Sequence, residues 1–94
     1  SADGKLLASA GFDNVARVYE LETGKLLRSF PEPMKLEAIA LTPDGNYLVT
    51  GGHQRKFTFY RLRDGQKVFE QPSPRTEYLD FSADGRLLLT AHED

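Results

Sequence analysis

Two short segments of this sequence place a cation and a carboxylate two residues apart. The first pair is Lys35 and Glu37, and the second is Arg75 and Glu77. If the fold brings the two segments together, the four side chains form a charged ring that grips a partner peptide, or they neutralise one another as exposed ion pairs. Exposed ion pairs contribute only about 0–1 kcal/mol each. Both arrangements remain open, and all four residues are candidate partner contacts.

A second group of candidate contacts precedes tight turns. Phe12 and His53 occupy matching positions in the repeat described below, and Arg55 follows His53 by two residues. An exposed aromatic side chain at such a position is a frequent anchor of protein interfaces. The alternative, an aromatic ring that covers a neighbouring loop, is equally open. We expect these three residues at a partner-binding edge.

Patterns for catalysis and metal binding are absent from the sequence. It has no Gly-x-Ser-x-Gly nucleophile turn, no Gly-x-x-x-x-Gly-Lys-Ser/Thr phosphate loop, no His-Glu-x-x-His and no cysteine. His53 and the terminal His92, Glu93 and Asp94 are possible zinc ligands, but nothing in the sequence makes them converge, so we interpret 92–94 as a polar loop. We therefore expect no enzymatic activity, no metal and no cofactor.

The composition is that of an ordinary globular chain. Its 94 residues are 39% hydrophobic and 28% charged, with a net charge of −2, which indicates neither nucleic acid nor an anionic membrane as a partner. No apolar run approaches the roughly 20 residues that cross a bilayer, and no signal peptide is visible. A start at Ser1, without Met, suggests a processed chain or an excised fragment. The sequence does not name the compartment, and we expect an intracellular one.

The candidate contacts are positioned by an internal repeat. Asp3-Gly4 recurs as Asp44-Gly45 and as Asp84-Gly85, at spacings of 41 and 40 residues. Further matches lie in the same register, including 18–21 with 59–62 and 31–33 with 72–74. Fixed-period similarity of this length is the signature of a repeat architecture.

Each period consists of short apolar stretches separated by Asp-Gly, Gly and Pro, and this pattern predicts strands. No stretch has helical periodicity. The strands are expected near 5–10, 15–21, 25–30, 36–42, 46–51, 56–62, 66–70, 76–82 and 86–91. Four strands in about 40 residues is the arrangement of one blade of a β-propeller.

The segment SADGKLLASAGFDNVARVYELETGKLLRSF resembles a WD-repeat unit, and the resemblance extends over the whole chain. Tyr19-Glu20 and Tyr60-Arg61 stand where the family has Trp-Asp. The resemblance implies a hydrogen-bond network of His, Ser/Thr, Asp and Trp within each blade. Ser9, Asp13 and Tyr19 match part of it, whereas Gln54 replaces the Asp in the second unit, so the network is expected to be incomplete and the blades to depend on packing.

The expected fold is therefore all-β, with antiparallel four-stranded blades of a WD-repeat-like propeller that is incomplete in one chain. Residues 1–30 would form the last three strands of one blade, 36–70 a complete blade and 76–94 the first strands of the next. Propellers close with about four to eight blades, so this chain needs others. It is a piece of a longer propeller that other chains help to hold, or several copies assemble into a ring or a swapped pair.

The resemblance implies a protein–protein interaction scaffold that binds a protein or peptide and has no chemistry of its own. The loops at one end of the channel, 12–14, 53–55 and 92–94 together with 31–35 and 72–75, would carry the contacts. The alternatives are the propeller domain of an enzyme such as a peptidase, and a fragment or engineered unit that assembles into a ring.

Overall fold

The computed structural model describes residues 4–11, 13–82 and 88–92, and none of these residues is helical. They form nine strands, each within two residues of its expected position. The strands are β1 Leu6–Ala10, β2 Val15–Glu20, β3 Leu26–Pro31, β4 Leu36–Leu41, β5 Tyr47–Gly52, β6 Lys56–Arg61, β7 Gln66–Pro72, β8 Thr76–Phe81 and β9 Leu88–His92.

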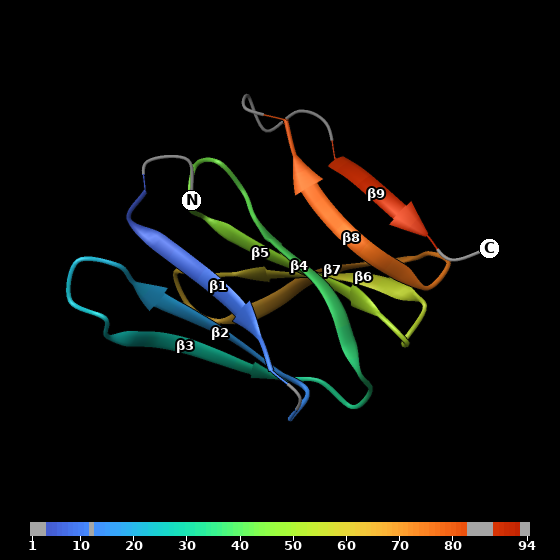
Figure 1. Cartoon of the computed structure of the whole chain (residues 1–94), viewed down its shortest axis with the longest axis horizontal. Helices are drawn as coiled ribbons and strands as arrows, with labels where there is room; N and C mark the ends of the chain where they lie inside the picture. Colours follow the sequence, from blue (N-terminus) through green and yellow to red (C-terminus); the bar gives the residue numbers. More distant parts are fainter. Residues whose placement is uncertain (1–3, 12, 83–87, 93–94) are drawn as a thin grey trace.

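The strands pair in chain order into three antiparallel sheets. The first sheet is β1-β2-β3, the central sheet is β4-β5-β6-β7, and the third is β8-β9. Figure 1 shows the sheets arranged as a fan that does not close, with β1, β4 and β8 side by side. The expected fold class, antiparallel blades of an incomplete propeller, is confirmed.

The glycines of the first two Asp-Gly turns share one backbone geometry. Gly4 and Gly45 have φ of 72° and 77°, a region that glycine enters without a steric penalty. In the second turn, Oδ1 of Asp44 accepts hydrogen bonds from Oγ1 of Thr42 (2.6 Å) and from the amide of Asn46 (2.9 Å). These bonds lower the pKa of Asp44 and hold the carboxylate charged, which fixes the link from β4 to β5.

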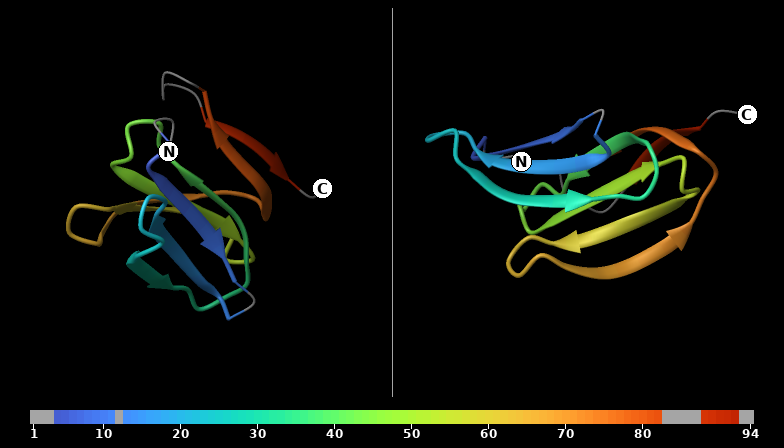
Figure 2. Two further views of the ribbon diagram at one scale, coloured as in Figure 1. Left: turned by 60° about the vertical axis from the view of Figure 1, so that its left-hand side comes forward. Right: turned by 90° about the horizontal axis from the view of Figure 1, so that it is seen from below.

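The first and central sheets stack face to face over one apolar core. Alternate residues of β2, such as Ala16 and Val18, meet Leu48 of β5, and all three are almost fully buried. Phe30 of β3 stacks on Tyr60 of β6 with 4.3 Å between the ring centroids. Figure 2 (right) shows the two sheets as successive layers.

The opposite face of the central sheet packs on β8. Ala38, Ala40 and Val49 bury against Leu79, with Phe57 and Phe59 at the margin. Both aromatic residues lie on one face of β6 because side chains two residues apart on a strand share a face.

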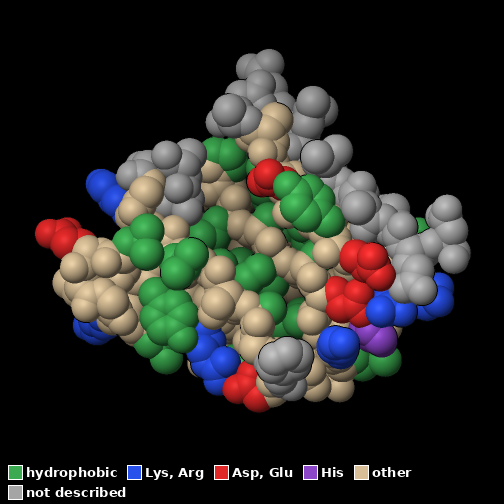
Figure 3. Space-filling view, in the orientation of Figure 1, with side chains coloured by type: hydrophobic (Ala, Val, Ile, Leu, Met, Phe, Trp, Pro, Cys, Tyr) green, Lys and Arg blue, Asp and Glu red, His purple; other side chains and the backbone are tan. Residues whose placement is uncertain are grey.

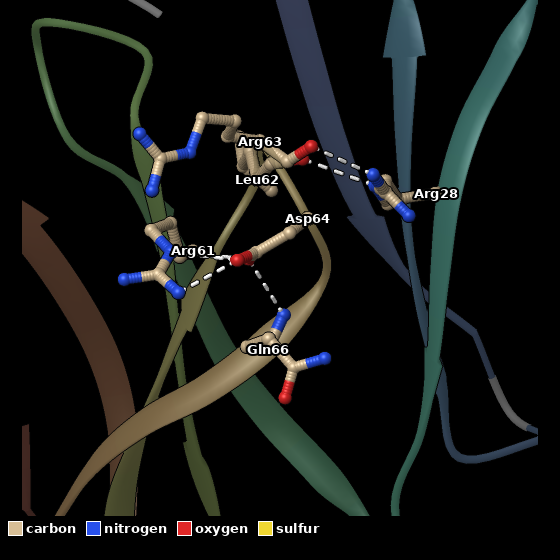
Figure 4. A network of polar contacts seen from close by, with 6 residues as sticks. All are labelled: Arg28, Arg61, Leu62, Arg63, Asp64 and Gln66. Carbon is tan, nitrogen blue, oxygen red and sulfur yellow. Dashed lines mark hydrogen bonds and ion pairs between the residues drawn. The ribbon is translucent and has the colours of Figure 1, made fainter.

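Arg28 joins the first two sheets at their outer strands. From β3 its Nε donates to the carbonyl of Leu62 (3.0 Å) and its Nη2 to that of Arg63 (2.9 Å) in the β6–β7 turn. Figure 4 shows that the same turn is closed by Arg61 and Asp64, whose side chains are 2.6 Å apart. One guanidinium therefore satisfies two carbonyls of the neighbouring sheet.

The incomplete sheets leave apolar side chains in solvent. Leu7 of β1 is 50% exposed, Leu26 of β3 46% and Phe69 of β7 54%. Large exposed apolar patches are typical of surfaces that bind another protein segment.

Candidate partner-binding site

Three of the predicted site residues meet where the central and third sheets join. Glu37 extends from β4, His53 lies between β5 and β6, and Arg75 precedes β8. Oε1 of Glu37 accepts from Nε of Arg75 at 2.8 Å, lies 2.6 Å from its Nη2, and contacts Nε2 of His53. The guanidinium, and secondarily the imidazole, hold the pKa of Glu37 below its usual range.

This cluster neutralises one carboxylate with a cation of the next sheet. The side chain of Glu37 is 12% exposed, whereas Arg75 and His53 are each 32% exposed. The sequence left open a charged ring that grips a partner and mutual neutralisation as ion pairs. The structure contains an ion pair, which joins Glu37 to Arg75 of the neighbouring repeat unit. The remaining surface of Arg75 and His53 still faces solvent at the loop end.

Lys35 and Arg55 lie beside this cluster. The carbonyl of Lys35 accepts from the amide of His53 (3.1 Å), and the carbonyl of Arg55 accepts from the amide of Ser73 (3.0 Å). These bonds tie three connecting loops together, and both residues are exposed. Arg55 adopts φ of 58°, the left-handed geometry of a tight turn.

The other predicted contacts are not brought into this cluster. Glu77 is exposed on β8, two residues beyond Arg75. Phe12 lies outside the described residues.

Sequence reasoning missed a buried carboxylate. Glu32, between β3 and β4, is 8% exposed. It accepts hydrogen bonds from Oγ1 of Thr50 (2.9 Å), Nε2 of Gln54 (2.5 Å) and the hydroxyl of Tyr60 (2.6 Å). The prediction of an incomplete network is therefore wrong for the central sheet. Gln54 could replace an Asp because the acceptor comes from Glu32 instead.

The only available signal was a Pro-Glu-Pro sequence, and the other copy has Ser73 at the equivalent position. The repeat therefore identified a turn at 31–33, not a buried acceptor. Burial, together with the hydrogen bond to Glu32, raises the pKa of Tyr60 well above its usual value. Tyr60 stays protonated and remains a donor.

The described residues of the first sheet do not reproduce this network. Asp13 pairs with Arg17, with 2.5 Å between Oδ2 and Nη2, and its Oδ1 accepts from the amide of Val15. The pairing lowers the pKa of Asp13. In place of the expected grouping with Ser9 and Tyr19, Asp13 in the turn before β2 pairs with Arg17 of β2.

The described part of the chain contains no group of three His, Asp or Glu side chains placed to hold a metal. Glu93 and Asp94 lie outside it. Asp80 of β8 is exposed, and its carboxylate accepts a hydrogen bond from the hydroxyl of Tyr78 (3.1 Å). Within the same residues no helix has the length and apolarity to cross a membrane.

Comparison with known proteins places the repeat in a family. The model of the family described as "WD domain, G-beta repeat" matches residues 24–60, from the turn before β3 into β6. The chain is 29% identical over its whole length to telomerase protein component 1 of Rattus norvegicus, and 31% identical over 71% of its length to the WD repeat-containing protein SL1-17 of Schistosoma mansoni. It spans 4% and 23% of those proteins.

Among solved structures, hydrazine synthase of Kuenenia stuttgartiensis superimposes on 98% of this chain with a TM-score of 0.83 and 22% sequence identity. The match covers 27% of that chain, so this fold occurs there as part of a larger protein.

Proposed function

Because the chain belongs to the WD-repeat family, we propose that it is part of a non-catalytic scaffold that binds a protein or peptide at its loop end. The observation that carries this proposal is the set of tied loops around Glu37. Backbone hydrogen bonds hold these loops in place, and they present Lys35, Arg55, His53 and Arg75 to solvent. A preformed surface binds with little ordering cost.

The charge of this surface suggests the chemistry of the partner. Glu37 is already neutralised by Arg75, so the exposed Lys35 and Arg55 leave an excess of positive charge beside it. An acidic peptide segment complements such a surface. Further β segments, from other chains or copies, would cover the open faces of the first and third sheets.

Charge reversal at Arg55 tests the loop-end proposal. In the propeller completed by its other segments, Arg55→Glu should reduce the amount of partner protein that is recovered. The reason is that an acidic segment of the partner would then meet a carboxylate. Arg63→Glu is the matched control, since Arg63 is equally an exposed arginine but lies in the β6–β7 turn. Equal partner recovery with Arg55→Glu and wild type, measured by quantitative mass spectrometry, would refute the proposal.

A further inference from the structure

Leu27 is an exposed apolar residue that the incomplete sheets do not explain. Figure 3 shows apolar side chains gathered in the hollow lined by β1, β4 and β8, where further segments of the propeller would pack. Leu27 lies elsewhere, on β3, two strands away from the open edge of β1. It is 42% exposed, and it lines a pocket whose walls belong to two sheets that already pack on each other.

This rim pocket is formed by the outer parts of the first and central sheets. Its volume is about 270 Å³, and its lining residues are Leu6, Val18, Leu27, Arg28 and Leu62. Val18 is almost fully buried beneath the others, and Leu62 comes from the turn that follows β6. Because the inner strands β1, β4 and β8 lie side by side, β3 and this pocket lie toward the outer rim of the fan (Figure 1).

A β-bulge places Leu27 in the pocket wall. The register of β2 against β3 shifts at this point, so Leu27 is an extra residue between Leu26 and Arg28, which both pair with β2. Bulges of this kind redirect a side chain and stop an edge strand from pairing further. The same bulge occurs in β7 at Val68, which is also exposed. The bulge therefore belongs to the repeat, and it favours recognition of side chains over strand addition at this rim.

Arg28, in contrast, is specific to this pocket. The equivalent residue of the central sheet is Phe69, so the repeat does not require a cation here. Arg28 donates hydrogen bonds to the carbonyls of Leu62 and Arg63, which fix the position of its guanidinium (Figure 4). The turn leaves room for it, since a Cβ on Gly65 would lie 3.1 Å from Nη1. The guanidinium is thus held in place before a ligand binds.

The positive charge of Arg28 is not compensated by the described part of the chain. Both of its acceptors are neutral carbonyl groups. Glu20, at the end of β2, accepts from Oγ1 of Thr23 (2.8 Å) and forms no ion pair with Arg28. The side chain of Arg28 is half-buried, and water screens a half-buried charge less than an exposed one. The pocket therefore combines space for an apolar side chain with a fixed positive charge.

We propose that the rim pocket binds a protein segment that carries a leucine-sized apolar side chain next to a carboxylate. The apolar side chain enters between Leu27 and Leu62, and the carboxylate pairs with Arg28. Burial of the apolar side chain supplies most of the affinity, and the ion pair supplies selectivity. This surface is separate from the loop end, because β2 and β6 lead from the loop end to the turns beside the pocket. The sheets would therefore bind partner segments at both ends.

The test measures the binding of two synthetic peptides to the assembled propeller that contains this chain. One peptide is Ser-Gly-Ser-Leu-Asp-Gly-Ser, and the other has Asn in place of Asp. NMR of methyl-labelled leucine and valine detects weak binding and locates it. The Asp peptide should shift the methyl signals of Leu27, Leu62 and Val18 in a saturable way and leave those of Val68 unchanged. No shift at Leu27, or shifts confined to other sites, overturns the proposal.

Leu27→Ser tests the apolar contact. It should weaken binding of the Asp peptide about threefold to tenfold, because the pocket loses part of its apolar wall. Val68→Ser is the matched control, since Val68 occupies the same bulge position and is also 42% exposed. It should leave the affinity unchanged. Equal weakening by the two substitutions would show that the pocket does not hold the leucine of the peptide.

Arg28→Gln tests the charge. Wild type should prefer the Asp peptide over the Asn peptide about threefold to tenfold, and Arg28→Gln should lose this preference. The ratio of two affinities on one protein does not depend on its folded fraction, so destabilisation by the loss of Arg28 does not imitate the result. A preference that persists in Arg28→Gln, or is missing from wild type, contradicts the proposal. Partner loss with Arg55→Glu at the loop end is independent of this pocket, so either proposal can fail alone.

Discussion

The hydroxyl of Tyr60 donates a 2.6 Å hydrogen bond to Glu32, which joins β6 to the connection between the first and central sheets. Both groups are buried, and Thr50 and Gln54 donate to the same carboxylate. A buried carboxylate requires such donors, since desolvation without them is costly. The junction of the two sheets is thus held by a polar cluster as well as by the apolar core.

Tyr60→Phe should destabilise the assembled protein by about 1–3 kcal/mol, because Glu32 loses a donor that water cannot replace. Urea denaturation measures the effect. Tyr47→Phe makes the same chemical change at a half-buried tyrosine and should shift the midpoint little. Similar losses for the two variants would show that the hydrogen bond contributes nothing specific.

Arg28→Ala should loosen the outer strands of the first two sheets, since the carbonyls of Leu62 and Arg63 lose their shared donor. We expect a loss of about 1–3 kcal/mol and faster hydrogen exchange in β3 and in the β6–β7 turn. Arg63→Ala, which removes a neighbouring side chain but leaves its carbonyl bonded, is the control. If exchange accelerates uniformly over the whole chain, the clamp between these sheets is not the cause.

Asp64 should titrate with a pKa of about 2, chiefly because Arg61 binds its carboxylate. Its folded pKa lies below the unfolded value of 3.8, so its contribution to stability is present above about pH 4 and is lost as the pH falls toward 2. Carbon-detected NMR titration measures this, and Arg61→Gln should raise the pKa. An unchanged pKa in Arg61→Gln would contradict the assignment.

The isolated chain is predicted not to be a well-folded monomer, because its sheets expose apolar residues such as Leu7 of β1, Leu26 of β3 and Phe69 of β7. Light scattering should show self-association that weakens with Leu7→Glu or Phe69→Glu. Val68→Glu is the control, because it adds the same charge at the neighbouring exposed residue of β7. If it weakens self-association as much as Phe69→Glu does, the added charge alone is the cause. A monomer with cooperative two-state unfolding would refute this prediction.

The strands were predictable because their turns carry local chemistry. Asp-Gly at 44–45 requires a glycine conformation that few other residues adopt, and its recurrence sets the period. Phe57 and Phe59 share one face of β6 because side chains alternate along a strand, a rule that needs no knowledge of the tertiary structure. Both features depend only on residues that are close together in the sequence.

The polar contacts between sheets were predicted only in part. Glu37 pairs with Arg75, 38 residues away, because the stagger of neighbouring sheets brings the cation of one unit to the carboxylate of the previous one. The repeat identified these charged residues as candidates, but it did not predict that Glu37 would pair with Arg75. Glu32 has a serine at its equivalent position, so comparison of the copies conceals its role.

Because of Glu32, the unit that folds together with the central sheet begins earlier in the sequence than the first strand of that sheet. β4 begins at Leu36, yet a polypeptide that started there would lose the acceptor of three donors in the same sheet. A transplantable unit of this protein must therefore include Glu32 as well as β4 to β7. Recombination or circular permutation between Glu32 and Leu36 would separate the central sheet from the carboxylate that its own side chains bind.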